Sequence, residues 1–170
     1  METGNIVEHV TEQDIRRSMV NCSRGEAASL VLPKNLAVLD WEALEFLGWR
    51  DPKAPRRGYV VRWLDDRPVG IALRAAESRM SHRVAAMCLL CQSVHSGADV
   101  SLFTARRSGQ AGRDGNTIGT YMCADLACCH HVRSGVRPTP DQPDPAAVLE
   151  DRRVALAARL DAFINEVLRP

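Results

Sequence analysis

Two close pairs of cysteines constrain this chain more than any other feature of its 170 residues. The first pair is Cys88 and Cys91, and the second is Cys123 and Cys128. Two cysteines at such a spacing can turn both sulfurs toward one cation, and a second pair then completes a tetrahedral shell around zinc. A shell of four thiolates leaves no open coordination position, so the sequence predicts one structural zinc ion.

Spacing alone leaves the ligand set partly open. Cys129 adjoins Cys128, and either residue can be the fourth ligand. His95, His130 and His131 also lie close in sequence, but a histidine would enter a complete shell only by displacing a cysteine. We therefore expect the histidines to be exposed or to hydrogen-bond the ligands from outside the shell.

Disulfide bonds are a weaker explanation of the cysteines. Cys22 and Cys129, which remain after the two pairs, have no matching spacing. The amino terminus also lacks the charged-then-apolar pattern of a secretory signal. The sequence thus favours thiols reserved for metal in a reducing compartment, the cytoplasm.

The stretch between the two pairs predicts a hairpin. Residues 100–105 and 116–122 are rich in β-branched and aromatic side chains, and residues 106–115 are rich in turn formers. After Cys123 no helix breaker occurs before Ser134 and Gly135, so we expect the second pair to open a short helix that ends at Gly135. The amino end of that helix would favour the thiolate of Cys123. A knuckle, a hairpin and a helix in this order are typical of a treble clef.

The amino-terminal part predicts two helices and a second hairpin. Thr11 to Asp14 form a capping-box pattern that starts a first helix, which residues 21–25 stop. A second short helix is expected over residues 40–47. Residues 59–64 and 69–74 read as strands joined at 65–68, and the hairpin on the zinc side can join them in one sheet.

The carboxy-terminal part predicts a linker and one long helix. Three prolines mark residues 134–143 as the linker, and Asp144 with Pro145 supplies a cap and a first-turn proline. The helix places apolar side chains on one face: Leu149, Leu156, Leu160, Phe163 and Val167. We expect this face to cover a core.

Composition bounds the architecture. With 45% apolar residues, the chain can bury one core. The fold class is therefore predicted as α+β, a treble-clef zinc finger merged with a small antiparallel sheet and flanking helices. Residues 1–82 form the amino-terminal part, 83–137 the zinc module and 138–170 the linker and last helix, and we expect them to make one compact domain. The sequence contains no run of 18 apolar residues, so no membrane span is predicted.

Charge is concentrated in the predicted zinc module. The whole chain carries a net charge of +1, which argues against a protein that binds nucleic acid by charge alone. Residues 83–137 hold six arginines against three aspartates. A hairpin tip fixed to a metal centre loses little entropy on binding a partner. The candidate partner-binding residues on and beside the hairpin are Arg106, Arg107, Arg113, Asn116 and Tyr121.

Six segments together resemble a known family over residues 11–168. They read NCSRGE at 21–26, FLGWRDPKAP at 46–55, GIALR at 70–74, MCLLC at 87–91, HSG at 95–97 and GTYMCADLAC at 119–128. In these segments the chain resembles FBP-domain proteins, which are similar to the treble-clef carboxy-terminal domain of FusB-type fusidic acid resistance proteins. The resemblance places the metal on Cys88, Cys91, Cys123 and Cys128, and so chooses Cys128 over Cys129.

The resemblance implies binding rather than chemistry. FusB-type proteins bind elongation factor G through the zinc-bearing domain and promote its release from the ribosome. The implied function is a zinc-stabilised, non-enzymatic protein that docks on elongation factor G. The alternative is a zinc finger that binds RNA or the ribosome through the same arginines, although few aromatic residues accompany them. No catalytic motif occurs in the sequence, so we predict no enzyme.

Overall fold

A five-stranded antiparallel sheet forms the centre of the protein in a computed structural model that describes residues 10–170. Its strand order is β1-β2-β3-β6-β7, and a separate two-stranded sheet pairs β4 with β5. The strands are β1 (Leu47–Arg50), β2 (Arg57–Leu64), β3 (Arg67–Ala75), β4 (Ala85–Met87), β5 (Val94–Ser96), β6 (Val100–Arg106) and β7 (Thr117–Cys123). The helices are α1 (Glu12–Ser18), α2 (Arg24–Ala28), α3 (Gly109–Arg113), α4 (Cys128–His131) and α5 (Pro145–Leu168), with short 3₁₀ turns at Leu36–Val38, Trp41–Ala43 and Gly97–Asp99. The fold class is α+β, as predicted.

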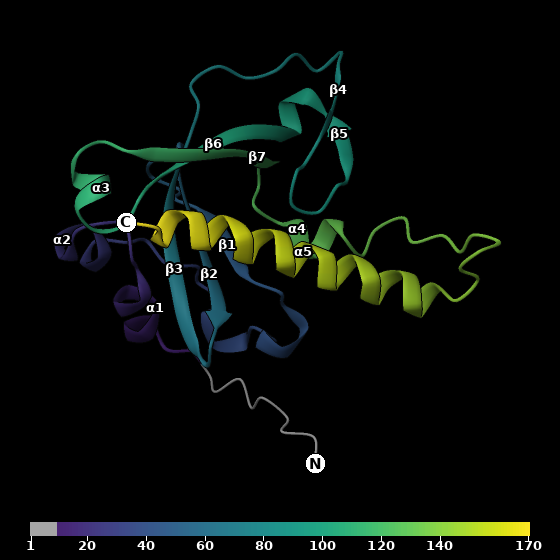
Figure 1. Ribbon diagram of the computed structural model, residues 1–170, viewed down its shortest axis with the longest axis horizontal. Coiled ribbons are helices and arrows are strands. Elements are labelled where there is room, and N and C mark those ends of the chain that lie inside the picture. Colours follow the sequence, from purple (N-terminus) through teal and green to yellow (C-terminus); the bar gives the residue numbers. More distant parts are fainter. Residues whose placement is uncertain (1–9) are drawn as a thin grey trace.

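The alternation of side chains along the strands gives the large sheet two different faces. On one face Val60, Ile71 and Phe103 pack with α5 and with the buried cysteines. On the other face Tyr59 and Val61 pack with the amino-terminal segment. In Figure 1 the yellow helix α5 crosses in front of the strands, and the β4–β5 hairpin stands at the top of the molecule.

Both predicted hairpins are present. β2 and β3 meet at a two-residue turn in which Asp65 and Asp66 have left-handed φ angles of 46° and 61°. Such primed turns match the twist of the flanking strands. The zinc-side hairpin β6–β7 joins β3 through the pairs Arg74–Thr104 and Ala75–Phe103, as the sequence predicts. Its connecting loop contains the short helix α3, which was not predicted because the loop is rich in turn-forming residues.

Each of the two amino-terminal helices begins at a capping box. The Thr11 hydroxyl accepts a hydrogen bond from the Asp14 N–H, and the Asp14 side chain accepts from the Thr11 N–H, which confirms the predicted capping box. A second capping box at Ser23 and Glu26 starts α2, where the sequence analysis expected only the end of the first helix. Helix α1 can lie against β3 because Gly70 has no side chain, and a Cβ there would come within 2.6 Å of the Met19 sulfur.

The predicted helix over residues 40–47 is wrong. Only Trp41–Ala43 form a 3₁₀ turn, and Leu47 begins strand β1. Leu47 and Trp49 alternate with Gly48 as strand residues, and burying both on the sheet outweighs the helical periodicity. Gly48 faces the metal-side loop, where a Cβ would come within 2.5 Å of the Leu126 carbonyl oxygen.

The terminal helix is confirmed with its cap. Asp144 accepts a hydrogen bond from the Ala146 N–H, and Pro145 occupies the first turn. The buried side chains of α5 are Val148, Leu156, Leu160, Phe163, Ile164 and Val167. Leu149, which the sequence analysis placed on the buried face, is only partly buried. One apolar cluster draws on residues from 46 to 167, which supports our proposal that the three predicted parts form one domain.

Candidate metal centre

The four paired cysteines converge at one buried point. The Sγ atoms of Cys88 and Cys128 lie 3.7 Å apart, and those of Cys91 and Cys123 lie 3.5 Å apart. All four sulfurs lie within 4.8 Å of one another, and no side chain among them is more than 8% exposed. A zinc ion with bonds of about 2.3 Å requires sulfurs about 3.8 Å apart at the corners of a tetrahedron. The cluster therefore has the size of a one-zinc, tetrathiolate site.

A tight turn supplies the first two ligands. The pairing of Met87 with Val94 in β4–β5 holds the two ends of the turn together. Within the turn, the Cys91 N–H donates to the Cys88 sulfur at 3.5 Å, and the Gln92 N–H donates to the Cys88 carbonyl at 2.9 Å. Gln92 takes a left-handed φ of 58° to close the turn. The cysteine spacing predicts a knuckle here but gives no sign of the small sheet that supports it.

The second pair is built differently from the prediction. Cys123 is the last residue of β7, and helix α4 begins only at Cys128. The expected helix end therefore does not act on the Cys123 thiolate. A turn closed by the Leu126 N–H and the Cys123 carbonyl at 2.9 Å carries the chain from one ligand to the other. Helix α4 ends at His131, four residues before the predicted end at Gly135, which takes a left-handed φ of 62° in the turn that follows.

Proximity of the sulfurs shifts their protonation. Hydrogen bonds from Cys123 and Cys128 lower the pKa of Cys88 to about 7. The hydrogen bond with Cys123 and burial together raise the pKa of Cys128 above its ordinary value. A divalent cation would replace the shared protons and hold all four sulfurs as thiolates, because only the thiolate binds metal.

The rival ligands lie outside the tetrahedron. Cys129 turns away, and its thiol donates to the Phe46 carbonyl at 3.3 Å. Burial raises the pKa of the Cys129 thiol to about 12, which opposes the ionised form a metal needs. His95 Nε2 lies 3.6 Å from the Cys123 sulfur, and His131 pairs with Asp125 at 2.9 Å. His95, His131 and Cys123 form a second close group. Its only thiolate already belongs to the four-cysteine set.

A second polar cluster, the Glu45 clamp, lies on the other side of α4. It consists of Glu45, Arg133 and Arg153. Arg133 donates to both carboxylate oxygens of Glu45 at 2.9 Å, and Arg153 donates to one of them at 2.6 Å. Burial would raise the pKa of Glu45, but these hydrogen bonds outweigh it and lower the pKa to about 2. The clamp joins the amino-terminal segment to α4 and α5.

The predicted partner-binding residues lie in two groups, one at each end of the β6–β7 hairpin. Arg106 pairs with Glu26 at 3.0 Å, and Arg107 contacts Glu166 of α5 at 3.4 Å. Arg113 and Asn116 are exposed at the α3 end of the β6–β7 hairpin. Tyr121 is 42% exposed near the opposite end, where its carbonyl accepts a hydrogen bond from the Leu89 N–H of the knuckle.

An apolar surface surrounds the knuckle, and it was not predicted from the sequence. Seven large apolar side chains are exposed among residues 10–170, and five of them come from this region. We call these five the apolar knuckle group: Val84, Met87, Leu89, Val94 and Tyr121. The sequence signal for this surface was the pair of leucines between Cys88 and Cys91, of which Leu90 is buried and Leu89 is exposed.

Comparison with known proteins agrees with the geometry of the site. The sequence model of the FBP C-terminal treble-clef zinc-finger matches residues 14–167. The chain belongs to this family. Its buried cysteine cluster is that of a zinc finger with one structural zinc.

Among solved structures, the chain is similar to one described as the structure of the fusidic acid resistance protein FusC. The sequence identity is 25% and the TM-score is 0.43. The likeness covers 59% of this chain and 43% of the FusC chain, so this protein spans less than half of that neighbour. No curated protein sequence matches the chain significantly. Within residues 10–170, no helix has the length and apolar character needed to cross a bilayer.

Proposed function

We propose that this protein is a non-enzymatic adaptor that docks on translation elongation factor G and promotes its release from the ribosome. The family resemblance in the cysteine segments supports the choice of partner. The donor set supports the absence of metal catalysis, because four thiolates fill the zinc shell and leave no position for water or substrate. Such an adaptor would act in the cytoplasm.

The observation that carries the proposal is the apolar knuckle group. Met87 and Val94 stand directly opposite each other in the β4–β5 register, and Leu89 lies in the turn between them. Val94 is 65% exposed and Leu89 is 47% exposed. Exposed apolar side chains that gather on one element mark interaction sites more often than scattered ones do.

Rigidity makes this group suited to docking. Its turn is held by the metal ligands Cys88 and Cys91, by the hydrogen bond to Tyr121 and by Arg159 of α5, which donates to the Leu90 carbonyl at 2.9 Å. Side chains on such a fixed frame lose little conformational entropy on binding. We propose that Tyr121 contributes to this surface, and that Arg106, Arg113 and Asn116 belong to a second contact at the far end of the hairpin. Arg107 would support that contact from beneath, through α5.

A pull-down with purified elongation factor G tests the proposal. We expect wild type to retain the factor, and Leu89→Ser with Val94→Ser to reduce retention at least about tenfold, since buried interface anchors commonly contribute 2 kcal/mol or more. The matched control is Val154→Ser, which changes an apolar side chain that is 59% exposed on α5. Zinc content is measured in every variant, because a lost metal would mimic a lost contact. No retention of the factor by zinc-loaded wild type would end the proposal.

The alternative, binding to RNA, predicts a different salt dependence. Affinity for single-stranded RNA would fall with log salt at a slope of about −0.7 for each phosphate contacted. Replacement of Leu89 and Val94 would leave such binding unchanged. A steep salt slope together with binding that survives these replacements would favour RNA over the factor.

A further inference from the structure

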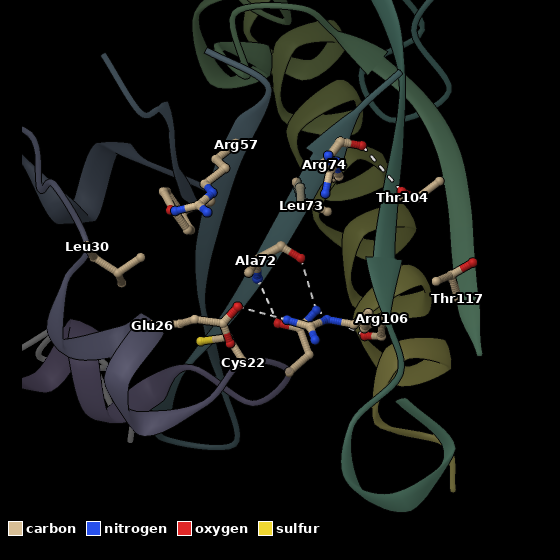
Figure 2. A pocket seen from close by; sticks show the side chains of 12 residues that line it. Cys22, Glu26, Leu30, Arg57, Ala72, Leu73, Arg74, Thr104, Arg106 and Thr117 are labelled. Atoms are coloured by element: carbon tan, nitrogen blue, oxygen red, sulfur yellow. Dashed lines mark hydrogen bonds and ion pairs between the residues drawn. The ribbon is translucent and has the colours of Figure 1, made fainter. Parts of the chain in front are cut away.

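A groove lined by arginines opens on the sheet face opposite α5. Helix α1 and residues 30–41 pack on β1–β3 on this face, but their apolar cluster includes no residue of β6 or β7. Where the cover ends, a cavity of about 430 Å³ lies between α2 and the strands. Figure 2 shows Arg57, Arg74 and Arg106 around this groove, with Glu26 of α2 facing Arg106.

Strand register places the arginines side by side. Arg57 of β2 is the direct partner of Arg74 in β3, and Arg74 is the partner of Thr104 in β6. Arg106, two residues beyond Thr104, pairs with Thr117 of β7. Because side chains alternate along a strand, these residues all project from the same face of the sheet.

The floor of the groove is fixed by Asn21. β3 and β6 pair at only two positions and then separate. The buried Asn21 amide spans the gap, donating to the Ala72 carbonyl at 2.9 Å and to the Arg106 carbonyl at 3.0 Å. Its oxygen accepts from the Ala72 N–H at 2.7 Å. The strands therefore diverge by a defined amount, and the groove is part of the fold rather than a gap between loose loops.

The groove holds more arginines than carboxylates that could pair with them. Within residues 10–170, neither Arg57 nor Arg74 has a carboxylate within ion-pair distance, and only Arg106 pairs, with Glu26. Like charges directly opposite each other on neighbouring strands destabilise a sheet. The Arg57–Arg74 pair thus costs stability in the free protein, and an anion placed between the two guanidinium groups would remove that cost.

We propose that this groove binds a small phosphate-bearing molecule. Planar guanidinium groups bind phosphate oxygens through two parallel hydrogen bonds, and three of them surround the groove. At its β6–β7 side the Thr117 hydroxyl offers a further hydrogen bond, whereas the Thr104 hydroxyl donates to the Arg74 carbonyl at 3.4 Å. The volume is that of a ligand pocket for a compound of nucleotide size or smaller. This site is separate from the apolar knuckle group and shares only Arg106 with the proposed second contact, so its test, which changes Arg57 and Arg74, does not depend on the proposed function.

Glu26 is the internal competitor for this ligand. Its carboxylate occupies Arg106, but both side chains of the pair are about half exposed, at 49% and 53%. Ion pairs of that exposure are weak and can be displaced. Glu26→Gln removes the competing charge while a glutamine retains the capping box with Ser23. Phosphate binding should therefore tighten several-fold in this variant.

The test is calorimetric titration of zinc-loaded full-length protein with inorganic phosphate, pyrophosphate and ADP at fixed ionic strength. We expect wild type to bind at least one of them. Arg57→Ala with Arg74→Ala should weaken that binding at least about tenfold, since hydrogen bonds to charged groups are strong. The charge-matched control is Arg79→Ala with Arg83→Ala, because both arginines are exposed and neither lines the groove. The control should bind as wild type does.

Each result of the titration either supports or overturns the proposal. Tighter binding of ADP than of pyrophosphate would identify a nucleotide, whereas equal binding would identify the phosphates alone as the recognised group, and both support the proposal. Equal weakening in the two double variants would show non-specific charge attraction and overturn it. No binding of any of the three compounds would also overturn it. Zinc content and melting temperature, measured before and after titration, exclude metal loss or unfolding as the cause.

Discussion

The metal centre and the Glu45 clamp hold helix α4 from two sides with opposite arrangements of charge. At the metal centre four thiolates would surround one cation, whereas in the clamp two guanidinium groups surround one carboxylate. Adjacent residues of α4 contact the two clusters: Cys128 faces the metal site, and Cys129 faces Phe46 beside the clamp. A buried charge is stable only when it is paired, and this short helix depends on two such pairings.

The difference between the two clusters lies in where their energy comes from. A structural zinc contributes on the order of 10 to 16 kcal/mol at neutral pH, which is comparable with the whole stability of a domain. A buried ion pair gains much less, because its attraction mainly repays the loss of hydration. The metal centre should therefore decide whether the module folds, and the clamp should decide how firmly α4 and α5 attach to the rest.

Loss of a metal ligand should have the largest effect. Cys88→Ser should abolish stoichiometric zinc binding and unfold at least residues 87–135, because the remaining three thiolates no longer close the shell. Zinc analysis, circular dichroism and thermal melting measure this. The control is Cys22→Ser, a half-buried thiol outside the cluster, which should keep one zinc per chain. A Cys88→Ser protein with wild-type zinc content and melting temperature would refute the metal centre.

Breaking the clamp should be the next largest effect. Glu45→Ala leaves Arg133 and Arg153 without their shared carboxylate, but both guanidinium groups are about one-third exposed and keep other partners, so the loss should be about 1 to 3 kcal/mol. Zinc stoichiometry should not change. Urea unfolding measures the loss, and Glu42→Ala, an exposed neighbour, should stay within about 0.5 kcal/mol of wild type. Equal stability of the two variants would mean that the clamp contributes nothing.

The same contrast explains what could be predicted from the sequence. The spacing of Cys88, Cys91 and Cys123 with Cys128 or Cys129 is typical of a metal site, so the centre and the treble clef could be predicted, and the family resemblance then chose Cys128. Glu45, Arg133 and Arg153 are ordinary surface residue types, far apart in the chain and without a shared period. Nothing local marks a glutamate that the fold buries, and the clamp was therefore missed.

Local signals also failed where tertiary packing overrode them. Residues 40–47 have helical periodicity, but Leu47 and Trp49 gain more by alternating on the sheet as β1. The sequence singled out Arg106 as a binding candidate but did not group it with Arg57 and Arg74, because the three meet only through strand register. Register depends on the pairing of β3 with β6, a contact between segments that composition and spacing do not describe.

Acid should weaken the clamp in a defined pH range. The pKa of Glu45 is about 2 in the folded protein against 4.5 for an ordinary glutamate, so its contribution is complete above pH 4.5 and is lost as the pH falls toward 2. The lost amount is about 3 kcal/mol, at 1.36 kcal/mol for each pKa unit.

Comparison with Glu45→Gln isolates this titration from release of the metal in acid. The glutamine cannot ionise, so the stability difference between wild type and the variant should be constant above pH 5 and shrink below it. Urea unfolding at successive pH values, over the range in which both proteins retain zinc, measures the difference. A difference that does not change with pH would show that the carboxylate of Glu45 is not held ionised by the two arginines.

The smallest predicted effect concerns Cys129, which lies beside the clamp and directly follows the metal ligand Cys128. Cys129→Ala removes one weak hydrogen bond to the Phe46 carbonyl and a small apolar volume, which should cost about 1 kcal/mol and leave one zinc per chain. Cys128→Ser, one residue earlier, should release the metal. Zinc content distinguishes the two variants even where their melting temperatures overlap. If Cys129→Ala lost the metal while Cys128→Ser kept it, the ligand register would be shifted by one residue, and α4 would have to present its other side to the zinc.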